Sequence, residues 1–512
     1  MLHIKIKKIK NKIDRTRKGE MFVNTNRSLL EVIKENIKDG ELSDTFSLPR
    51  EEDDDPNKLR WADGAMDGIS IYHMGRPEIT DSQMDIVSDA FSMLDDNERV
   101  MARMKDFFAE ISPLGGIDAI QKFIFDHINT LDHRAVYMLA VDCLFSCDID
   151  IVKFGMILVE IFHEPDESIK DIIRTLGLSD EFTIFAVFDM MSWSDGNNEI
   201  FELARKVHGW GRIHAVERLE PETQEIKDWL LAEGINNYVV PDYSALEVYQ
   251  KADIATLLKK NITDEQLEQI AQLLISMFDE GPVNCISALS ENEANTMLRD
   301  FITQVNKHTL SLDICRIILT ISRDERFQNF ASECSEILNS NECKELIEIE
   351  LKSGNAIELA KAVNIPYKEK IFEFMKNDFE NGYRLCNHLI DDEQYREQVI
   401  DLFRKSLPVD SMVGEPTKES GYYDLYSDYN KLTFLIQYLD KYPMCGSDLV
   451  ISALNMPTVQ CRNQAITTIS LWCKEKNCTL SELSDDILKA VQHMKSIEVD
   501  ERVINRIEKN GF

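Results

Sequence analysis

Apolar residues recur every three or four positions along most of the chain, which is the period of an amphipathic helix. The pattern is clearest between residues 208 and 234, where two short apolar stripes follow each other. The apolar positions of these two stripes are Ile213, Val216, Leu219, Ile226, Trp229 and Leu230. Two helices this short cannot bury both stripes alone, so they need similar neighbours, as the helix pairs of a solenoid do.

The sequence also predicts where the second of these helices begins and ends. Pro221 suits its first turn, because the missing N–H would be unpaired there anyway. Glu222 and Glu225 place negative charge near the positive end of the helix. Gly234 can adopt the left-handed conformation that ends a helix.

From residue 80 onward the pattern is almost wholly helical. Thr80 or Asp81 can cap the first of these helices. Further helices are predicted at Asp96–Ile111, Ile117–Ile128, Asp132–Phe145, Ile149–Phe162, Ile169–Leu176, Glu181–Trp193 and Glu199–Val207. Similar helices begin near Phe154, Ile184 and Ile213, which indicates a degenerate repeat of about thirty residues.

One order of residues recurs in three of the expected helices. Arginine is followed by alanine and branched apolar residues at 134–139, 212–219 and 462–471. This spacing is similar to that of the first helix of HEAT repeats. We therefore expect an all-α fold, a HEAT-like α-solenoid of antiparallel helix pairs with an irregular acidic loop near its N-terminus.

Proline and glycine divide the chain further, because they break helices and favour turns. Residues 46–78 hold three prolines, three glycines and an acidic run, and residues 407–430 hold two prolines and a cluster of tyrosines. The predicted parts are a basic extension at 1–20, an N-terminal helix and acidic Trp/Gly loop at 21–79, a solenoid at 80–406, a linker at 407–430 and C-terminal repeats at 431–512.

The first twenty residues differ in charge from the rest. They carry eight Lys or Arg against two acids, a net charge of +6. Because the whole chain has a net charge of −34, the remaining residues carry −40. Lys18-Gly19-Glu20 has codons that can resemble a bacterial ribosome-binding site before Met21, and we expect translation to start at Met21. The alternative is a basic arm that touches anionic lipid or an acidic face of the protein.

The net charge of −34 argues against a nucleic acid as partner, because phosphate binding needs cationic side chains. It is compatible with a protein partner that has a basic surface. The chain has no run of about 18 apolar residues, so no membrane span is predicted. Eleven cysteines in a long chain without a secretory signal indicate reduced thiols and a cytoplasmic location. The sequence does not predict the oligomeric state.

The most distinctive string is Trp61-Ala-Asp-Gly-Ala-Met-Asp-Gly68. In one interpretation its glycines shape a binding surface near His73 and Arg76. In the other, which we favour, Asp63 and Asp67 form local turns and Trp61 docks on the first helices. Burying most of a tryptophan side chain would contribute on the order of 2–3 kcal/mol.

A second candidate group lies in the helical hairpin at 208–234. Trp210, Arg212 and His214 could line the inner face of the solenoid as binding residues. The preferred interpretation is that Trp210 packs in the core and that Arg212 and His214 are exposed.

The acidic run has part of the pattern of a calcium site. Asp53, Asp55 and Asn57 occupy the first three ligand positions of an EF-hand, but Lys58 and Gly64 stand where the turn glycine and the closing glutamate belong. A different site, with Asp53, Asp55 and Asp63 as weak candidates, is the alternative to solvated surface acids. We expect no metal and no cofactor.

No catalytic motif was found in the sequence. Gly209-Trp210-Gly211 has two glycines of the dinucleotide fingerprint, but His214 replaces the third and no strand precedes it. His163-Glu164 does not continue into the zinc-protease motif.

Two strings carry a resemblance to a known family, PREEDDDPNKLRWADGAMDGISIYH and GWGRIHAVERLEPETQEIKDWLL. They resemble a bacterial family of uncharacterised proteins, some of which are labelled limonene hydroxylase. The label implies a monooxygenase, which would need haem, flavin, iron or copper. No motif for these is visible, so the resemblance assigns no catalytic residue.

These patterns predict a scaffold that binds another macromolecule, in the first place a protein, with no catalytic activity evident. The alternative is an enzyme, either the monooxygenase of the family label or a metal-dependent activity that uses the acidic loop.

Overall fold

The computed structural model describes residues 27–43, 45–49, 61–421 and 427–512. Within these residues the protein is all-helical, and its one isolated β-bridge joins Lys38 to Glu41. The predicted all-α class is therefore confirmed. No helix in these ranges is long and apolar enough to cross a membrane.

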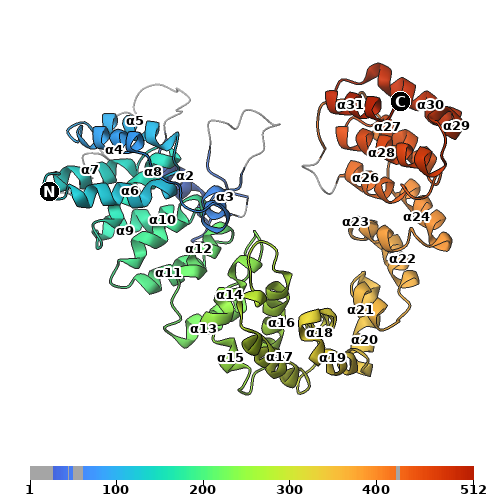
Figure 1. Ribbon diagram of the computed structural model, residues 1–512, viewed down its shortest axis with the longest axis horizontal. Helices are drawn as coiled ribbons and strands as arrows, with labels where there is room; N and C mark the ends of the chain where they lie inside the picture. The colour runs from blue at the N-terminus through green and yellow to red at the C-terminus, as the bar shows by residue number, and fades with distance from the viewer. Residues whose placement is uncertain (1–26, 44, 50–60, 422–426) are drawn as a thin grey trace. The chain divides into compact units, whose positions relative to one another are not determined.

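The chain divides into two compact units between Met297 and Leu298. This point lies inside the helix α17 (Glu291–Val305). Each unit is described by itself, and Figure 1 labels their helices.

The helices of the first unit have the following bounds: α2 (Leu29–Asn36), α3 (Ala65–Ile69), the π-helix η1 (Ser70–Met74), α4 (Asp81–Phe91), α5 (Asn97–Phe108), α6 (Pro113–Asp126), α7 (His133–Cys143), α8 (Ile149–Glu160), α9 (Glu167–Leu176), α10 (Asp180–Met191), α11 (Gly196–Ala204), α12 (Trp210–Arg218), α13 (Gln224–Glu233), α14 (Asp242–Lys251), α15 (Ile254–Leu257), α16 (Asp264–Asp279) and the short η2 (Ile286–Ala288).

Helices of the first unit pack in a regular order. Contacts run from α8 to α10, from α10 to α12, from α12 to α14 and from α14 to α16, and α8, α10 and α12 lie side by side in Figure 1. The helix that precedes each of α8, α10, α12 and α14 in the chain also packs against it. α8 and α10 are consequently covered from several sides, and residues 151–159 of α8 are all buried.

Side-chain caps explain where several helices begin. Thr80, one of the two predicted cap residues, forms a capping box with Gln83 at the start of α4. Thr223 caps α13 by accepting a hydrogen bond from the Ile226 N–H. The helix therefore begins at Gln224, and the prediction that Pro221 lies in its first turn is wrong.

Gly234 follows α13 with φ −61°, so it is not left-handed as predicted. A side chain at this position would lie 2.5 Å from the Leu230 carbonyl oxygen and 2.6 Å from Val248 Cγ2. The glycine is needed for the close approach of α13 and α14, and not for its conformational freedom.

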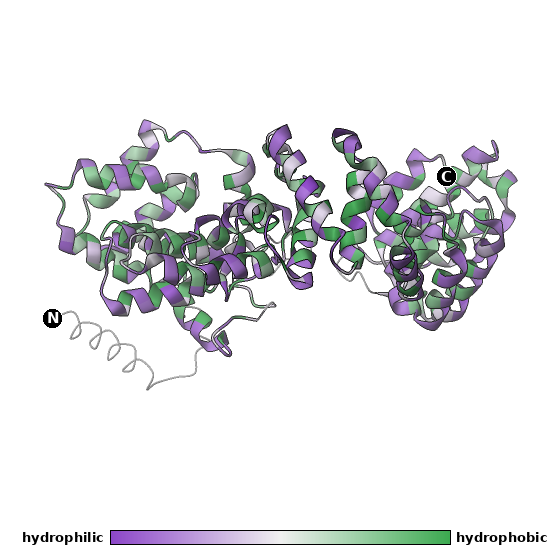
Figure 2. Cartoon of the chain, turned by 90° about the horizontal axis from the view of Figure 1, so that it is seen from below, coloured by the Kyte–Doolittle hydropathy of each residue, from purple (hydrophilic) through white to green (hydrophobic). Residues whose placement is uncertain are grey.

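The second unit contains α18 (Leu312–Arg323), η3 (Glu325–Phe330), α19 (Ala331–Leu338), α20 (Asn341–Glu350), η4 (Leu351–Ser353), α21 (Ile357–Ala362), α22 (Lys368–Asn377), α23 (Phe379–Gly382), η5 (Tyr383–His388), α24 (Glu393–Ser406), α25 (Val409–Met412), α26 (Asp428–Tyr438), α27 (Ser447–Leu454), α28 (Val459–Glu475), α29 (Leu480–Leu483), α30 (Asp485–Ile497) and α31 (Glu501–Lys509). Figure 2 shows hydrophobic and hydrophilic positions alternating along the helices of both units.

The segment at 407–430, predicted as a linker, lies within the second unit. Gly414 and Thr417 donate backbone hydrogen bonds to the carbonyls of Asn455 and Pro457. The buried Arg462 of α28 donates to the Thr417 carbonyl and forms an ion pair with Glu498 at 2.7 Å. These contacts attach the described part of the segment to the start of α28.

Candidate functional site

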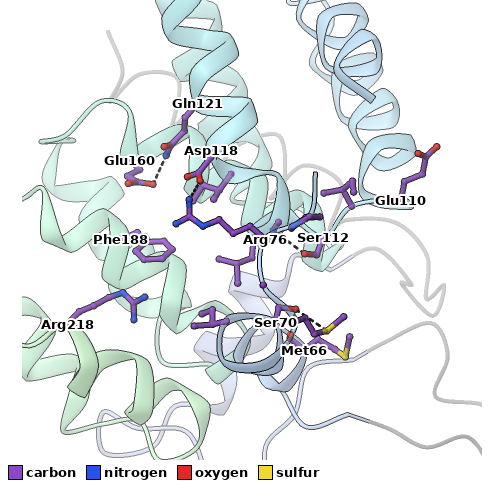
Figure 3. Close-up of a pocket in the computed structure, with 18 residues that line it drawn as sticks. Met66, Ser70, Arg76, Glu110, Ser112, Asp118, Gln121, Glu160, Phe188 and Arg218 are labelled. Atoms are coloured by element: carbon purple, nitrogen blue, oxygen red, sulfur yellow. Dashed lines mark hydrogen bonds and ion pairs between the residues drawn. The ribbon is translucent and has the colours of Figure 1, made fainter. Parts of the chain in front are cut away.

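A pocket of about 780 Å³ lies beside η1 in the first unit. Figure 3 shows it between α3–η1, the start of α6 and the ends of α8, α10 and α12. Its lining is mixed: apolar side chains come from η1, α6 and α10, carboxylates from Glu110, Asp118 and Glu160, and guanidinium groups from Arg76 and Arg218. A pocket of this size can hold a small ligand or a few side chains of a peptide.

One wall of the pocket is the α3–η1 segment, which approaches α12 through two glycines. A Cβ atom at Gly68 would lie 2.1 Å from Trp210 Cε3, and one at Gly64 would lie 2.5 Å from the Asp180 carbonyl oxygen. Gly64 also has φ +76°, which favours glycine. The two strings that are most distinctive in the sequence therefore pack against each other.

A buried ionic cluster fixes the same segment. Lys153 Nζ of α8 lies 2.7 Å from Asp67 Oδ2 and 2.6 Å from Glu181 Oε1, and all three side chains are buried. The second oxygen of Glu181 accepts a hydrogen bond of 2.9 Å from the Gly64 N–H. Burial alone would lower the pKa of Lys153, but the two carboxylates hold it above its ordinary range.

The Gly209-Trp210-Gly211 string forms the N-terminus of α12. Asp180 Oδ1 accepts a hydrogen bond of 2.9 Å from the Gly211 N–H, and a Cβ at Gly209 would lie 2.0 Å from Asp180 Oδ2. Burial raises the pKa of Asp180 to about 7, although the hydrogen bonds from Gly211 and Gly209 oppose the shift. The glycines thus let a carboxylate approach a helix N-terminus, where it is favoured.

Aromatic side chains hold the other face of η1. The Tyr72 ring lies 6.3 Å from the Trp210 ring and 4.8 Å from the Tyr243 ring, centroid to centroid, and those two rings are 4.9 Å apart. The Tyr72 hydroxyl donates to Glu217 at 3.2 Å, and His73 Nε2 lies 2.8 Å from the Tyr243 hydroxyl. A π-helix is rare and often occurs at functional sites. Here its residues divide between the pocket and this aromatic anchor.

The expectation that Trp61 docks on the first helices is wrong, because its side chain is 47% exposed. The predicted turn at Asp63 and Gly64 is present, closed by the hydrogen bond from the Ala65 N–H to the Ala62 carbonyl, and Asp63 Oδ2 also accepts a hydrogen bond of 3.0 Å from the Leu48 N–H. Asp67 reaches Lys153 rather than forming a turn. The string is anchored by its acids and glycines and not by its tryptophan.

We therefore expect Trp61→Ala to lower the free energy of unfolding by about 1 kcal/mol, because about half of the side chain remains in water after folding. Urea unfolding of the full chain measures the change. A loss of several kcal/mol would contradict the exposure of this side chain.

Trp210 packs in the core as predicted, but the prediction that Arg212 and His214 are exposed is wrong. Arg212 Nε donates to the Val207 carbonyl at 2.7 Å and Nη1 donates to the Glu233 carbonyl at 3.0 Å. These bonds satisfy the guanidinium group between two turns of the chain. His214 is fully buried, and neither ring nitrogen has a hydrogen-bond partner among the described residues.

Burial, with a smaller effect of Arg218, lowers the pKa of His214 to about 3. The unfolded chain takes up a proton at this residue below about pH 6.5, while the folded protein does not until about pH 3. His214 therefore removes stability as the pH falls through this window. We expect the stability of His214→Leu relative to wild type to be about 2 kcal/mol higher at pH 4.5 than at pH 7.5, as measured by urea unfolding at both pH values.

The control for this pH dependence is Ile213→Val, a buried neighbouring substitution without a titrating group. Its loss of stability should be the same at both pH values. An equal difference between wild type and His214→Leu at both pH values would contradict a neutral buried imidazole.

The metal hypothesis finds no support in the described residues. Asp53 and Asp55 lie outside them, and no group of three His, Cys, Asp or Glu side chains that could hold a metal ion occurs in the ranges that the structure describes. Asp63 accepts a hydrogen bond from the Leu48 N–H, His73 contacts the Tyr243 hydroxyl, and Arg76 pairs with Asp118. The structure therefore does not bring Asp63, His73 and Arg76 into one cluster.

The sequence did not identify the pocket-lining residues of α6, α8, α10 and α12. The sequence does contain a signal for them, because a carboxylate interrupts each of the two longest apolar stretches. Glu160 lies in Phe154–Phe162 and Asp189 lies in Phe182–Met191. Glu160 lines the pocket, and Asp189 is fully buried without a hydrogen-bond partner for either carboxylate oxygen in the described structure. Comparison of the chain with protein-family models, curated proteins and solved structures finds no match.

Proposed function

We propose that this chain is a HEAT-like helical-repeat interaction protein, which binds a segment of another protein in the pocket beside η1. The repeat interpretation is supported by the order of contacts from α8 to α16 and by the preceding helix that packs on each of α8 to α14. It is also supported by Arg212 and Arg462. Both are buried near the start of a helix and donate to carbonyls of the preceding turn.

The observation that carries the binding proposal is the composition of the pocket. Met66 and Met74 stand at the pocket with 46% and 67% of their surface exposed, beside Ile111, Leu114 and Phe188. The flexible thioether of methionine adapts to different apolar side chains, so methionine is common on binding surfaces that accept varied partners. An apolar surface of this kind next to ionic groups suits a peptide segment better than a rigid small molecule.

Site-specific photocrosslinking tests the proposal in cells that naturally make the protein. A photoreactive phenylalanine analogue replaces Met74, and in a matched control it replaces Met191, which is 59% exposed on α10 and outside the pocket lining. We expect a discrete protein to crosslink from position 74 and not from position 191. Crosslinks that are absent from position 74, or equal at both positions, would overturn the proposal.

The competing function is the monooxygenase of the family label. Elemental analysis and an absorption spectrum of the purified protein separate the two functions. Iron, copper or flavin in stoichiometric amount would overturn the proposal of an interaction protein alone. All eleven cysteines are free, which supports our proposal that the protein acts in a reducing compartment, the cytoplasm.

A further inference from the structure

Two carboxylates of the pocket lining are held by neutral groups only. Gln121 Nε2 donates to Glu160 Oε2 at 2.7 Å, and Gln83 Nε2 donates to Glu110 Oε2 at 3.0 Å. Neither glutamate forms an ion pair with a described residue, and the Oε1 atom of each has no hydrogen-bond donor in the same part of the chain. Each amide therefore orients a carboxylate while leaving its charge uncompensated.

The arginines of the lining do not supply the missing charge. Arg76 pairs with Asp118, as Figure 3 shows. Arg218 lies 2.7 Å from Glu217 and donates to the His214 carbonyl, with its guanidinium group over the Phe188 ring. Both guanidinium groups thus have acidic partners, and the unpaired charge of the lining is negative.

The buried surroundings of Glu160 make its negative charge costly in the absence of a cation. Burial raises the pKa of Glu160, and the hydrogen bond from Gln121 and the more distant His163 oppose the shift. Asp189 of α10 lies close enough for the charge of Glu160 to raise its pKa further, beyond the effect of its own burial. A bound cation would lower the pKa of Glu160, because an opposite charge favours the ionised form.

Apolar surface lies next to both carboxylates. Ile111 and Leu114 follow Glu110 in the chain at the start of α6, and Phe188 belongs to the same lining as Glu160. Lysine and arginine combine an aliphatic stem with a terminal charge, so they can bury the stem on such surface while the charge meets a carboxylate. An acidic or purely apolar ligand would leave Glu110 and Glu160 unpaired.

We propose that the pocket binds a basic segment of a partner protein, with a lysine or arginine at Glu160, a second cationic residue at Glu110, and apolar neighbours packed on Ile111, Leu114 and Phe188. This inference rests on the proposed function, since it names the chemistry of the segment that the interaction protein would bind. The overall charge of −34 favours the approach of such a partner over long range.

Selection of random peptides displayed on phage against the full-length protein tests the chemistry. We expect the enriched sequences to carry lysine or arginine beside apolar residues. Binding of the enriched synthetic peptides should weaken by about tenfold or more in Glu110→Gln/Glu160→Gln, because two charge pairs are lost. Circular dichroism and urea unfolding establish that this variant is folded.

The matched control is Glu225→Gln/Glu265→Gln, which removes the same charge from exposed first-turn positions of α13 and α16. Its affinity for the enriched peptides should stay within about twofold of wild type. Enrichment without basic residues, absence of enriched peptides, or equal weakening in the control would overturn the inference. Tight binding of the polyamine spermidine, with no selected peptide bound, would instead assign the site to a small cation.

The two proposals can fail separately. If position 74 crosslinks a partner and Glu110→Gln/Glu160→Gln leaves that crosslink unchanged, the interaction function stands and the basic chemistry of the segment is rejected. If no partner crosslinks but basic peptides bind in a manner that requires both glutamates, the pocket chemistry stands and the protein-binding role is rejected.

Discussion

Lys153→Ala should lower the free energy of unfolding by about 3–5 kcal/mol, the largest effect that we expect from one substitution. The change leaves Asp67 and Glu181 buried beside each other without a cation. A buried carboxylate without a partner must take up a proton or draw in water, and both reduce stability. Because Asp67 belongs to α3, we also expect the wall of the pocket to separate from α8.

Urea unfolding followed by tryptophan fluorescence measures this loss, since four of the five tryptophans lie in the first unit. Limited proteolysis near residues 75–80 reports the release of α3–η1. The control is Lys122→Ala, which removes an exposed lysine paired with Asp126 and should change stability by less than about 1 kcal/mol. Similar stability of Lys153→Ala and this control would show that the buried cluster contributes little.

A triple variant separates charge from packing. Lys153→Met, Asp67→Asn and Glu181→Gln remove every charge of the cluster and keep side chains of similar size. The glutamine oxygen can still accept the hydrogen bond from Gly64. We expect this variant to be more stable than Lys153→Ala, because a buried charge without a partner is more costly than a neutral polar side chain.

Gly68→Ala is the second large effect, with an expected loss of about 2–3 kcal/mol. Alanine favours a helix over glycine by about 1 kcal/mol, so local propensity predicts a gain. The added methyl group would lie 2.1 Å from Cε3 of the buried Trp210 ring, and it cannot fit unless α3 or the ring moves. We expect the steric cost of the added methyl group to exceed the stability gained from the higher helix propensity of alanine.

Urea unfolding of Gly68→Ala and of the double variant Gly68→Ala/Trp210→Leu tests this origin. Trp210→Leu removes the ring, so adding Gly68→Ala in that background should lose less stability than in wild type. Gly281→Ala is the control, because its Cβ would meet only Asp242 Oδ1 at 4.0 Å. Equal losses in both backgrounds would show that the indole ring is not the obstacle.

Much of the helical content follows from local sequence. The three-to-four-residue apolar period and the capping pair Thr80 and Gln83 depend on neighbours in the chain, so α4 and the helices after it could be predicted. The ends were less predictable. Gly234 ends α13 without a left-handed conformation, because its role is set by Val248 of another helix.

The role of the distinctive string could not be predicted in the same way. The sequence favours Trp61 as its anchor, since a large aromatic side chain usually gains most from burial. The structure instead buries Asp67, because Lys153, 86 residues later in the chain, supplies a cation inside the core. Only the packing of α3 on α8 and α12 brings this partner close.

The sequence by itself determined the helical class, the positions of most helices of the first unit and the absence of a long apolar run, because each depends on residues within a few turns of one another. The tertiary structure decided which polar residues are buried and which form the pocket. Glu160, Phe188 and Arg218 come from three different helices, and their approach depends on how α8, α10 and α12 pack. Periodicity places a residue on a face of its helix but does not specify which residue of another helix it will meet.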